Sequence, residues 1–368
     1  MNRLLVAGGG TGGHVYPLLA VVEALRRQTH DAQVLFLGRP ESVEERLARK
    51  EGLPFGAIAA GAVRGKGPVR ATLSMLRVAT GTRAALRAIG RFEPEAVLVT
   101  GGYVSVPVAV AARIARRPLV VCLPDMEPGV AVQLLARLAQ TVTVSFDEVR
   151  KLLPAGKAIV TGYPVRAAFF VGQRAEARQR LGLAQDRRVL VVLGGSSGAR
   201  SLNEAVAGAL PELLELGTVC HITGALDWER VRARREALDT CVREQYRIYS
   251  YVEDDMAHLL RAADLVVARA GAAILGELPA VAVPSLLVPG DFAGGHQATN
   301  ARYLERCGAA DVLADSELPV QFVTRVRGLL ENPARLAAMA EAAGRLARPN
   351  ACAAIVAELA RAAGRPPS

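Results

Sequence analysis

Aromatic side chains and long apolar runs are scarce in this sequence. Phe, Trp and Tyr make up 4% of the 368 residues, and there is one tryptophan. No apolar stretch reaches the roughly 20 residues that a membrane-spanning helix needs, and no signal peptide precedes the first apolar segment, so we expect neither a transmembrane nor a secreted protein. No zinc finger, aromatic-basic RNA motif or basic zipper occurs, and we therefore expect no nucleic-acid partner.

Cysteine is rare and shows no pattern. The sequence contains five cysteines, an odd number, and none of them has metal-ligand spacing. They are Cys122, Cys220, Cys241, Cys307 and Cys352. Scattered thiols of this kind are typical of core residues in a reducing cytosol and argue against a disulfide framework.

Acidic residues are fewer than basic ones. Lys and Arg total 45 against 35 Asp and Glu, which gives a net charge of +10 at pH 7. This surplus favours an acidic partner, and an anionic membrane surface or a phosphorylated substrate would both fit. An arginine-rich proteome would produce the same surplus with no such partner.

The chain does contain a regular alternation of short apolar segments with helical patterns. Strand-like segments occur at residues 4–7, 33–38, 96–102, 118–123 and 141–145, and again at 188–193, 219–224, 246–252, 265–271 and 284–290. Such alternation is typical of parallel sheets covered by helices. We therefore predict an α/β fold.

Two Gly-rich turns divide the chain into halves with the same plan. GGGTGG (residues 8–13) and GGSSGA (194–199) each follow a strand-like segment and precede a helical one. We predict two doubly wound Rossmann-like domains facing a cleft. The first spans residues 1–163 with a returning C-terminal helix at 345–368, and the second spans 164–344. Open sheets of this type bind ligands at the carboxyl ends of their strands.

The first Gly-rich turn suits a phosphate, because bare backbone lets a ligand approach and a helix start favours an anion. Gly8, Gly10 and Gly13 satisfy the dinucleotide fingerprint. However, Arg39 follows the second strand, where an acidic residue should hold the ribose, so NAD(P) binding has little support. A P-loop is excluded because His14 stands where a lysine is required.

A set of seven motifs occurs in the order found in one family. They are GGGTGGHVYPLLAVVEAL, VRGKGP, LVTGGYVSVPVAVAA, GYPVR, LGGSSGARSLN, AGAAILGE and HQATNA. They resemble the MurG family of bacterial cell-wall transferases, from about residue 2 to about residue 345. The resemblance implies an inverting glycosyltransferase of the GT-B fold, with no cofactor and no obligatory metal. It implies transfer of N-acetylglucosamine from UDP-N-acetylglucosamine to the lipid-linked muramoyl-pentapeptide of peptidoglycan synthesis.

The resemblance also implies roles for individual residues. Glu277 matches the carboxylate that holds the donor ribose, Gln297 an amide that contacts the sugar, and Arg166 a phosphate-binding arginine. The other residues assigned to substrate binding are Thr11, Gly12, Gly13, Asp125, Ser196, Ala272, Ala273, Ile274, Leu275 and Gly276. Without the resemblance, a solvated helix residue would explain Glu277 and an ordinary turn would explain Ser196.

Two stretches depart from the family pattern. Residues 122–125 read CLPD where the family has His-Glu-Gln-Asn, so Leu123 replaces an acceptor-side glutamate. Ala270, Ile274 and Gly276 replace Ser, Thr and Ser. At about 1 kcal/mol per neutral hydrogen bond, these lost hydroxyls should weaken donor binding tenfold or more. The backbone N–H groups of this loop are still expected to hold phosphate.

The catalytic base is predicted to be His14, because a helix start disfavours the protonated imidazole and a neutral ring can accept a proton. Asp125 is the rival base. A third possibility is that His14 only hydrogen-bonds the loop or the acceptor.

A basic segment at residues 63–92 suggests attachment to a membrane surface. It contains Arg64, Lys66, Arg70, Arg77, Arg83, Arg87 and Arg91, interspersed with Leu73, Met75, Leu76, Val78, Leu86 and Ile89, and no acidic residue. A cationic amphipathic segment favours peripheral binding to anionic lipid, so we expect a protein on the cytoplasmic face of the membrane. An ordinary surface helix would show the same pattern.

Three other functions fit part of the sequence. They are a UDP-sugar transferase with a different acceptor, a UDP-N-acetylglucosamine epimerase, and a non-catalytic sugar-nucleotide-binding protein. The lost hydroxyls motivate the last of these.

Overall fold

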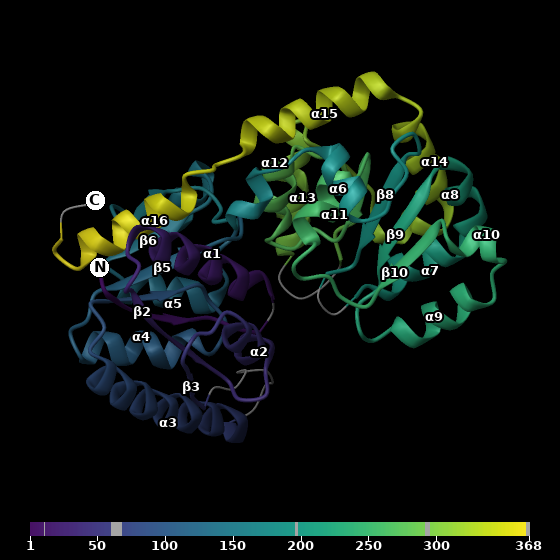
Figure 1. Cartoon of the computed structure of the whole chain (residues 1–368). Coiled ribbons are helices and arrows are strands. Elements are labelled where there is room, and N and C mark those ends of the chain that lie inside the picture. The colour runs from purple at the N-terminus through teal and green to yellow at the C-terminus, as the bar shows by residue number, and fades with distance from the viewer. Residues whose placement is uncertain (11, 60–67, 196–197, 291–294, 366–368) are drawn as a thin grey trace. The chain divides into compact units, whose positions relative to one another are not determined.

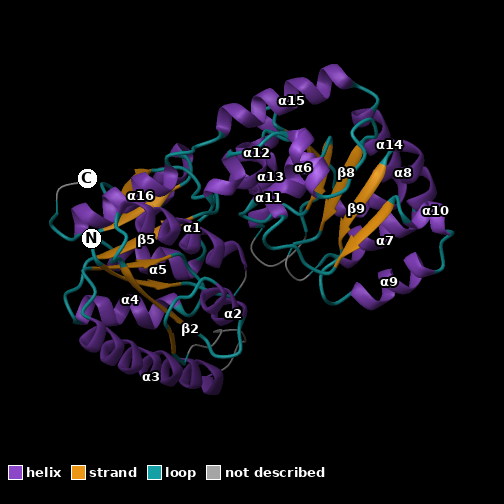
Figure 2. Cartoon of the chain, viewed as in Figure 1, coloured by secondary structure: helices purple, strands orange, loops and turns teal. Residues whose placement is uncertain are grey.

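The chain folds into two compact units. The computed structural model describes residues 1–10, 12–59, 68–195, 198–290 and 295–365 (Figure 1). The first unit comprises Met1–Arg166 and Arg348–Ser368, and the second comprises Ala167–Ala347. In each unit a sheet forms the central layer and helices cover it (Figure 2).

The first unit contains a parallel sheet of seven strands in the order β3-β2-β1-β4-β5-β6-β7. Its strands are β1 (Arg3–Ala7), β2 (Gln33–Gly38), β3 (Phe55–Ala57), β4 (Ala96–Val99), β5 (Leu119–Leu123), β6 (Thr141–Val144) and β7 (Ala158–Val160). Leu4 of β1 pairs in register with Val34 of β2 and Ala96 of β4. The inner strands are apolar on both faces because helices cover both sides of a parallel sheet.

Helices of the first unit include one from the end of the chain. They are α1 (Gly12–Gln28), α2 (Val43–Lys50), α3 (Pro68–Phe92), α4 (Ser105–Ile114), α5 (Val130–Leu138), the 3-10 helix η1 (Asp147–Leu152) and α16 (Ala351–Ala362). Helix α16, yellow in Figure 1, packs against α1. Ile355 and Leu359 are fully buried there, in one core cluster with Leu18 and Leu25.

The second unit contains a parallel sheet of six strands in the order β10-β9-β8-β11-β12-β13. Its strands are β8 (Val189–Leu193), β9 (Thr218–Ile222), β10 (Tyr246–Tyr249), β11 (Leu265–Ala268), β12 (Ser285–Leu287) and β13 (Ala310–Val312). Its helices are η2 (Ala167–Phe170), α6 (Arg174–Arg180), α7 (Arg200–Gly208), α8 (Leu210–Leu216), α9 (Trp228–Glu236), α10 (Thr240–Arg243), α11 (Met256–Ala262), α12 (Ile274–Val281), α13 (His296–Arg306), η3 (Asp315–Glu317), α14 (Leu318–Leu330) and α15 (Pro333–Leu346).

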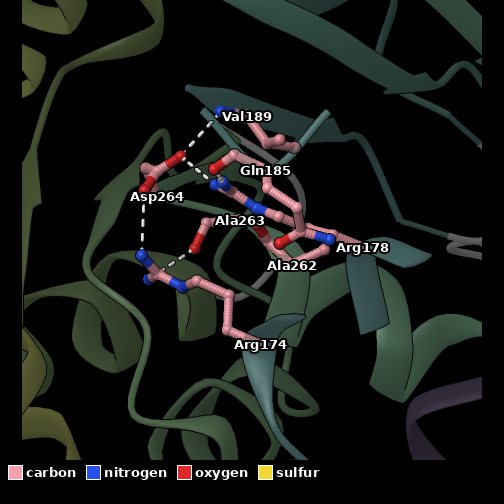
Figure 3. A network of polar contacts seen from close by, with 7 residues as sticks. All are labelled: Arg174, Arg178, Gln185, Val189, Ala262, Ala263 and Asp264. Atoms are coloured by element: carbon pink, nitrogen blue, oxygen red, sulfur yellow. Dashed lines mark hydrogen bonds and ion pairs between the residues drawn. The ribbon is translucent and has the colours of Figure 1, made fainter. Parts of the chain in front are cut away.

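An ionic cluster attaches α6 to the amino-terminal end of the second sheet (Figure 3). Asp264, which precedes β11, accepts a hydrogen bond from the Val189 N–H at 2.7 Å and pairs with Arg178 at 2.6 Å and Arg174 at 2.9 Å. Arg178 also donates to the carbonyls of Gln185 and Ala262. The arginine-rich sequence of α6 is therefore used for docking onto the sheet.

The predicted α/β fold with two doubly wound sheets is confirmed. The compact units divide after Arg166 and after Ala347, a few residues beyond the predicted boundaries, so Arg166 belongs to the first unit. Helix α1 starts at Gly12, inside the Gly-rich turn at residues 8–13 that was expected to precede it. Among the described residues, no helix has the length and apolar character needed to cross a membrane.

Candidate active site

Both Gly-rich turns lie where the strand order of their sheet reverses. In the first sheet β1 has β2 on one side and β4 on the other, and in the second sheet β8 lies between β9 and β11. At such a switch point the loops of the two central strands diverge and leave a crevice at their carboxyl ends, which is where open α/β sheets bind ligands. Each unit thus has one candidate binding edge.

The first Gly-rich turn leads directly into α1. Gly12 and Gly13 form the beginning of that helix. The first N–H groups of any helix lack intrahelical partners and carry the positive end of its dipole, so this end suits an anion. Thr11, predicted to bind substrate here, lies outside the described residues.

His14 is held by the loop that follows β4. The Thr100 hydroxyl donates to the His14 carbonyl at 2.7 Å. A Cβ on Gly101 would lie 3.2 Å from Nε2 of His14, so the imidazole packs directly over that glycine. Gly101 and Gly102 both have positive φ, 146° and 76°, which other residues adopt only with strain. His14 is half-buried at the binding edge of the first unit, as a base would need to be.

Glu44 is a buried acid that the sequence patterns did not single out. It is 0% exposed, and a Cβ on Gly9 would lie 2.5 Å from its Oε1. Arg39 pairs with it at 3.3 Å. The negative charge of the Glu44 carboxylate disfavours an anion beside Gly9. The amino-terminal end of α1 is therefore the better position for a phosphate in this turn.

The altered stretch at residues 122–125 divides into a buried and a half-buried part. Cys122 and Leu123 end β5 and are each 2% exposed. Burial raises the pKa of the Cys122 thiol to about 12, so it is no nucleophile at neutral pH. Asp125 is half-buried, and so is Glu127, a second acid in the same loop that the sequence motifs did not single out.

The second Gly-rich turn packs tightly on the end of β9. A Cβ on Gly198 would lie 2.3 Å from the Thr223 carbonyl oxygen, and Gly198 has a φ of 82°. Only glycine fits this combination of contact and conformation. Ser196, the predicted hydroxyl of this turn, lies outside the described residues.

The turn before α12 uses some of its predicted phosphate donors in hydrogen bonds of its own. The N–H groups of Ile274, Leu275 and Gly276 donate to the carbonyls of Gly271, Ala272 and Ala273, at 3.1–3.2 Å, because the turn is already helical. The N–H groups of Ala272 and Ala273 form no hydrogen bond to the part of the chain that the structure describes. Ala272 and Ala273 are therefore the better candidates for phosphate binding.

Glu277 and Gln297 lie on two neighbouring segments of the second unit. Glu277 is half-buried in the first turn of α12. The Oε1 atom of Gln297, on α13, accepts a hydrogen bond from the Gly290 N–H at 2.9 Å. A sugar contact by Gln297 would therefore come from Nε2.

Arg166 packs on an aromatic ring of α1. Its guanidinium carbon lies 5.2 Å from the centre of the Tyr16 ring, a cation–π geometry. Tyr16 is two residues after His14 in the chain. The predicted phosphate-binding arginine therefore contacts the same first turns of α1 that contain the predicted base.

Helix α3 presents a mixed basic and apolar surface. Leu76, Thr80, Arg83 and Arg87 follow helical spacing along one exposed face, whereas Ile89 is 1% exposed and packs inward. Next to Leu76, Met75 is 72% exposed. Of the apolar residues interspersed in this basic segment, Ile89 is thus a core residue. Arg64 and Lys66, and the side chains of Arg70 and Leu73, lie outside the described part.

Within the described residues, no group of three or more His, Cys, Asp or Glu side chains has the geometry of a metal site.

Each of the two domains matches a known family. The model of the glycosyltransferase family 28 N-terminal domain matches residues 4–144, and that of the C-terminal domain matches residues 189–355. The chain belongs to glycosyltransferase family 28. The prediction of a hexosyltransferase is thereby confirmed.

Members of family 28 with similar sequences share one name. A UDP-N-acetylglucosamine–N-acetylmuramyl-(pentapeptide) pyrophosphoryl-undecaprenol N-acetylglucosamine transferase from Roseiflexus sp. (strain RS-1) is 39% identical over 95% of this chain and 92% of its own length. The transferase of the same name from Desulforudis audaxviator (strain MP104C) is 37% identical over 99% of both chains. The predicted membership in this group of transferases is confirmed.

Solved structures agree with the fold. The crystal structure of Acinetobacter baumannii MurG is 28% identical, with a TM-score of 0.74, over 98% of this chain and 100% of that chain. A UDP-GlcNAc 2-epimerase from Neisseria meningitidis, bound to UDP-GlcNAc, has a TM-score of 0.68 at 15% identity, over 98% of this chain and 100% of that chain. At that identity the epimerase shares the fold alone.

Proposed function

We propose that this chain transfers N-acetylglucosamine from UDP-N-acetylglucosamine to the lipid-linked muramoyl-pentapeptide, converting lipid I to lipid II. The observation that carries the proposal is the binding edge of the second unit. There the second Gly-rich turn and the turn before α12 follow the two central strands, β8 and β11, with Glu277 one turn further on. Relatives 37–39% identical over nearly their whole length carry this activity in their names.

Donor recognition would use groups of different chemistry. The N–H groups of Ala272 and Ala273 suit the diphosphate, and the Glu277 carboxylate suits the ribose hydroxyls. Nε2 of Gln297 is a donor for the sugar. Arg166, with its guanidinium oriented by Tyr16, remains a predicted phosphate ligand.

The transfer inverts the anomeric carbon in one displacement. The acceptor hydroxyl oxygen attacks the anomeric carbon while the bond from that carbon to the UDP oxygen breaks. The electron pair of the broken bond leaves with UDP. A base takes the hydroxyl proton, and N–H donors stabilise the charge that develops on the diphosphate. We assign the base to His14, with Asp125 as the alternative.

A lipid-linked acceptor requires the enzyme to work at a membrane surface. The exposed face of α3, with Leu76 beside Arg83 and Arg87, suits peripheral contact with anionic lipid. We therefore propose attachment to the cytoplasmic face of the membrane through α3.

The decisive experiment incubates the purified chain with sugar-labelled UDP-N-acetylglucosamine, with and without lipid-linked muramoyl-pentapeptide. Label is expected in the lipid extract only when the acceptor is present. UDP release with isomerised sugar in the absence of acceptor would instead identify an epimerase. Donor binding with no product from this acceptor would contradict the proposed reaction. It would leave a different acceptor, which Leu123 motivates, or a non-catalytic role, which the lost hydroxyls motivate.

A further inference from the structure

Strand β11 has an arginine–aspartate cluster at each end. At its start lies the amino-end cluster, made of Arg174, Arg178 and Asp264 (Figure 3). At its finish lies the carboxyl-end cluster, made of Ser201, Arg269 and Asp315. Arg178 and Arg269 each have side chains that are 6% exposed, so the two guanidinium groups are equally buried.

The carboxyl-end cluster is closely hydrogen-bonded. Arg269 donates to the Ser201 hydroxyl at 2.6 Å, pairs with Asp315 at 2.7 Å and donates to the Val288 carbonyl at 3.1 Å. Ser201 donates in turn to Asp315 at 2.9 Å. One guanidinium thus joins the end of β11 to residues that follow β8, β12 and β13.

Arg269 and its partner Ser201 adjoin the two candidate donor loops. Ser201 is the second residue of α7, directly after the second Gly-rich turn. Arg269 directly precedes the turn that contains Ala272 and Ala273. The carbonyl of Ala270, in that turn, accepts a further hydrogen bond from the buried amide of Asn300 at 3.0 Å. Arg269 therefore connects the start of α7, which follows one of these loops, to the start of the other.

We propose that Arg269 is a positioning residue for UDP-sugar binding, holding the start of α7, which follows the second Gly-rich turn, in fixed register with the turn before α12. This inference rests on the proposed function. Arg269 acts through these loops, since its side chain is buried and both terminal nitrogens are engaged within the protein. A site preorganised in this way binds more tightly, because binding need not order the loops.

The amino-end cluster supplies a matched control. Arg178 makes as many contacts as Arg269, with one ion pair at 2.6 Å and two carbonyl bonds at 2.7 and 3.1 Å. It lies at the opposite end of the same strand, away from the carboxyl edge. If Arg269 had only a structural role, replacing either arginine would lower stability. The two variants would then bind UDP with equal affinity.

The test compares Arg269→Met with Arg178→Met in the full chain. Dissociation constants for UDP are measured by calorimetry, KM and kcat for UDP-N-acetylglucosamine in the transfer assay, and stability by urea unfolding. Arg269→Met should raise the UDP dissociation constant and the donor KM about tenfold or more, with a smaller change in kcat. Arg178→Met should leave both within about twofold at a comparable loss of stability. Equal UDP affinities in the two variants would overturn the proposal.

Milder variants cover the case in which Arg269→Met fails to fold. Ser201→Ala removes one partner of the guanidinium and should raise the UDP dissociation constant about threefold. Arg269→Lys keeps the charge but not the planar fork, and should bind UDP with an affinity between those of the parent and Arg269→Met. Unchanged UDP affinity in both milder variants would overturn the proposal. UDP binding by the parent without sugar transfer would contradict the proposed reaction alone, whereas no UDP binding by the parent would overturn both.

Discussion

Glu277 lies in the first turn of α12, beside the turn whose free N–H groups we assign to the diphosphate. A carboxylate can accept hydrogen bonds from both ribose hydroxyls, and such charged bonds contribute about 1.5–3 kcal/mol. Glu277→Ala should therefore raise KM for UDP-N-acetylglucosamine tenfold or more in steady-state assays. Glu305→Ala, at an exposed position of the neighbouring α13, is the control and should change nothing. An unaltered donor KM in Glu277→Ala would exclude a ribose contact.

His14 provides the second test at the scale of a residue. Because a general base acts in the chemical step, His14→Ala should lower kcat by about 100-fold or more while donor affinity, measured by UDP binding, stays nearly the same. Asp125→Asn should act mainly on acceptor KM. Near-normal turnover in His14→Ala together with its collapse in Asp125→Asn would assign the base to the aspartate. Glu127→Gln tests the other acid of that loop.

His221 is a buried histidine with a structural role in β9. It is 0% exposed, and its ring nitrogens hydrogen-bond to the Tyr246 hydroxyl and the Asn203 amide oxygen at 2.8 and 2.9 Å. Burial lowers the pKa of His221 to about 3. In the unfolded chain the His221 ring binds a proton near pH 6.5, whereas in the folded chain it does not. The free energy of unfolding therefore decreases as pH falls from about 6.5 toward 3.

The decrease in the free energy of unfolding that is due to His221 should be at most about 1.4 kcal/mol per pH unit. Urea unfolding of the parent and of His221→Gln, at intervals from pH 7.5 to 4.5, measures it as the difference in slope. The parent should have the steeper decline, and His30→Gln, at an exposed position, is the control. Parallel curves for parent and His221→Gln would contradict the neutral buried state.

At the scale of an element, α6 is held to the second sheet by two arginines on one aspartate. Arg174 is 48% exposed and Arg178 6%, and both pair with Asp264. Exposed ion pairs contribute about 0–1 kcal/mol, whereas removing one partner of a buried pair costs about 3–5 kcal/mol. Urea unfolding of Arg174→Ala and Arg178→Ala should therefore give a small and a large destabilisation. Equal losses would show that burial does not set the strength of this docking.

The edges of both sheets show where periodicity fails as a predictor. Strand β2 spans the predicted residues 33–38, and the other long apolar strands lie within one to three residues of their predicted ends. The strands β3, β7 and β13 were not predicted. Each has three residues, too few to display an alternation, and each lies at the edge of its sheet, paired with one neighbouring strand. Strand β12 also has three residues but lies within a longer apolar run, which was predicted.

The start of helix α1 was predicted too late for a related reason, since the Gly-rich turn at residues 8–13 was expected to precede the helix. Glycine has low helix propensity, so Gly12 and Gly13 indicate a turn when considered locally. In the folded chain the loop after β4 holds the backbone at His14, through the Thr100 hydroxyl, and the helix extends back to Gly12. A contact between residues 86 positions apart thus overrides a local preference.

At the scale of the whole molecule, we expect the net charge of +10 to promote binding to anionic membranes through α3. Each basic residue near an anionic surface contributes about 1 kcal/mol, so replacing Arg77, Arg83 and Arg87 by Gln should weaken binding to anionic vesicles by about a hundredfold. Co-sedimentation with vesicles at several salt concentrations measures this, and the residual binding should depend less on salt.

A second triple variant separates local from net charge. Arg232, Arg234 and Arg306, all exposed on the second unit, are replaced by Gln to remove the same charge elsewhere. This control should bind vesicles nearly as the parent does. Equal weakening in both triple variants, or none in the α3 variant, would make α3 an ordinary surface helix.

The sequence by itself determined the class of fold, the two Gly-rich turns and the family, because these depend on local periodicity, turn chemistry and short motifs. It also indicated Glu277 and His14 through motifs that are contiguous in the chain. Only the tertiary structure decided that the N–H groups of Ile274, Leu275 and Gly276 are already engaged, since this depends on where the helical turn begins.

Tertiary structure alone also brought Ser201 and Asp315 together, across 114 residues, on the guanidinium of Arg269. No local pattern distinguishes a buried arginine from an exposed one in a chain with 45 basic residues. The order of the strands in the sheet determines which residues meet at the carboxyl edge, and that order arises from the packing of the whole unit.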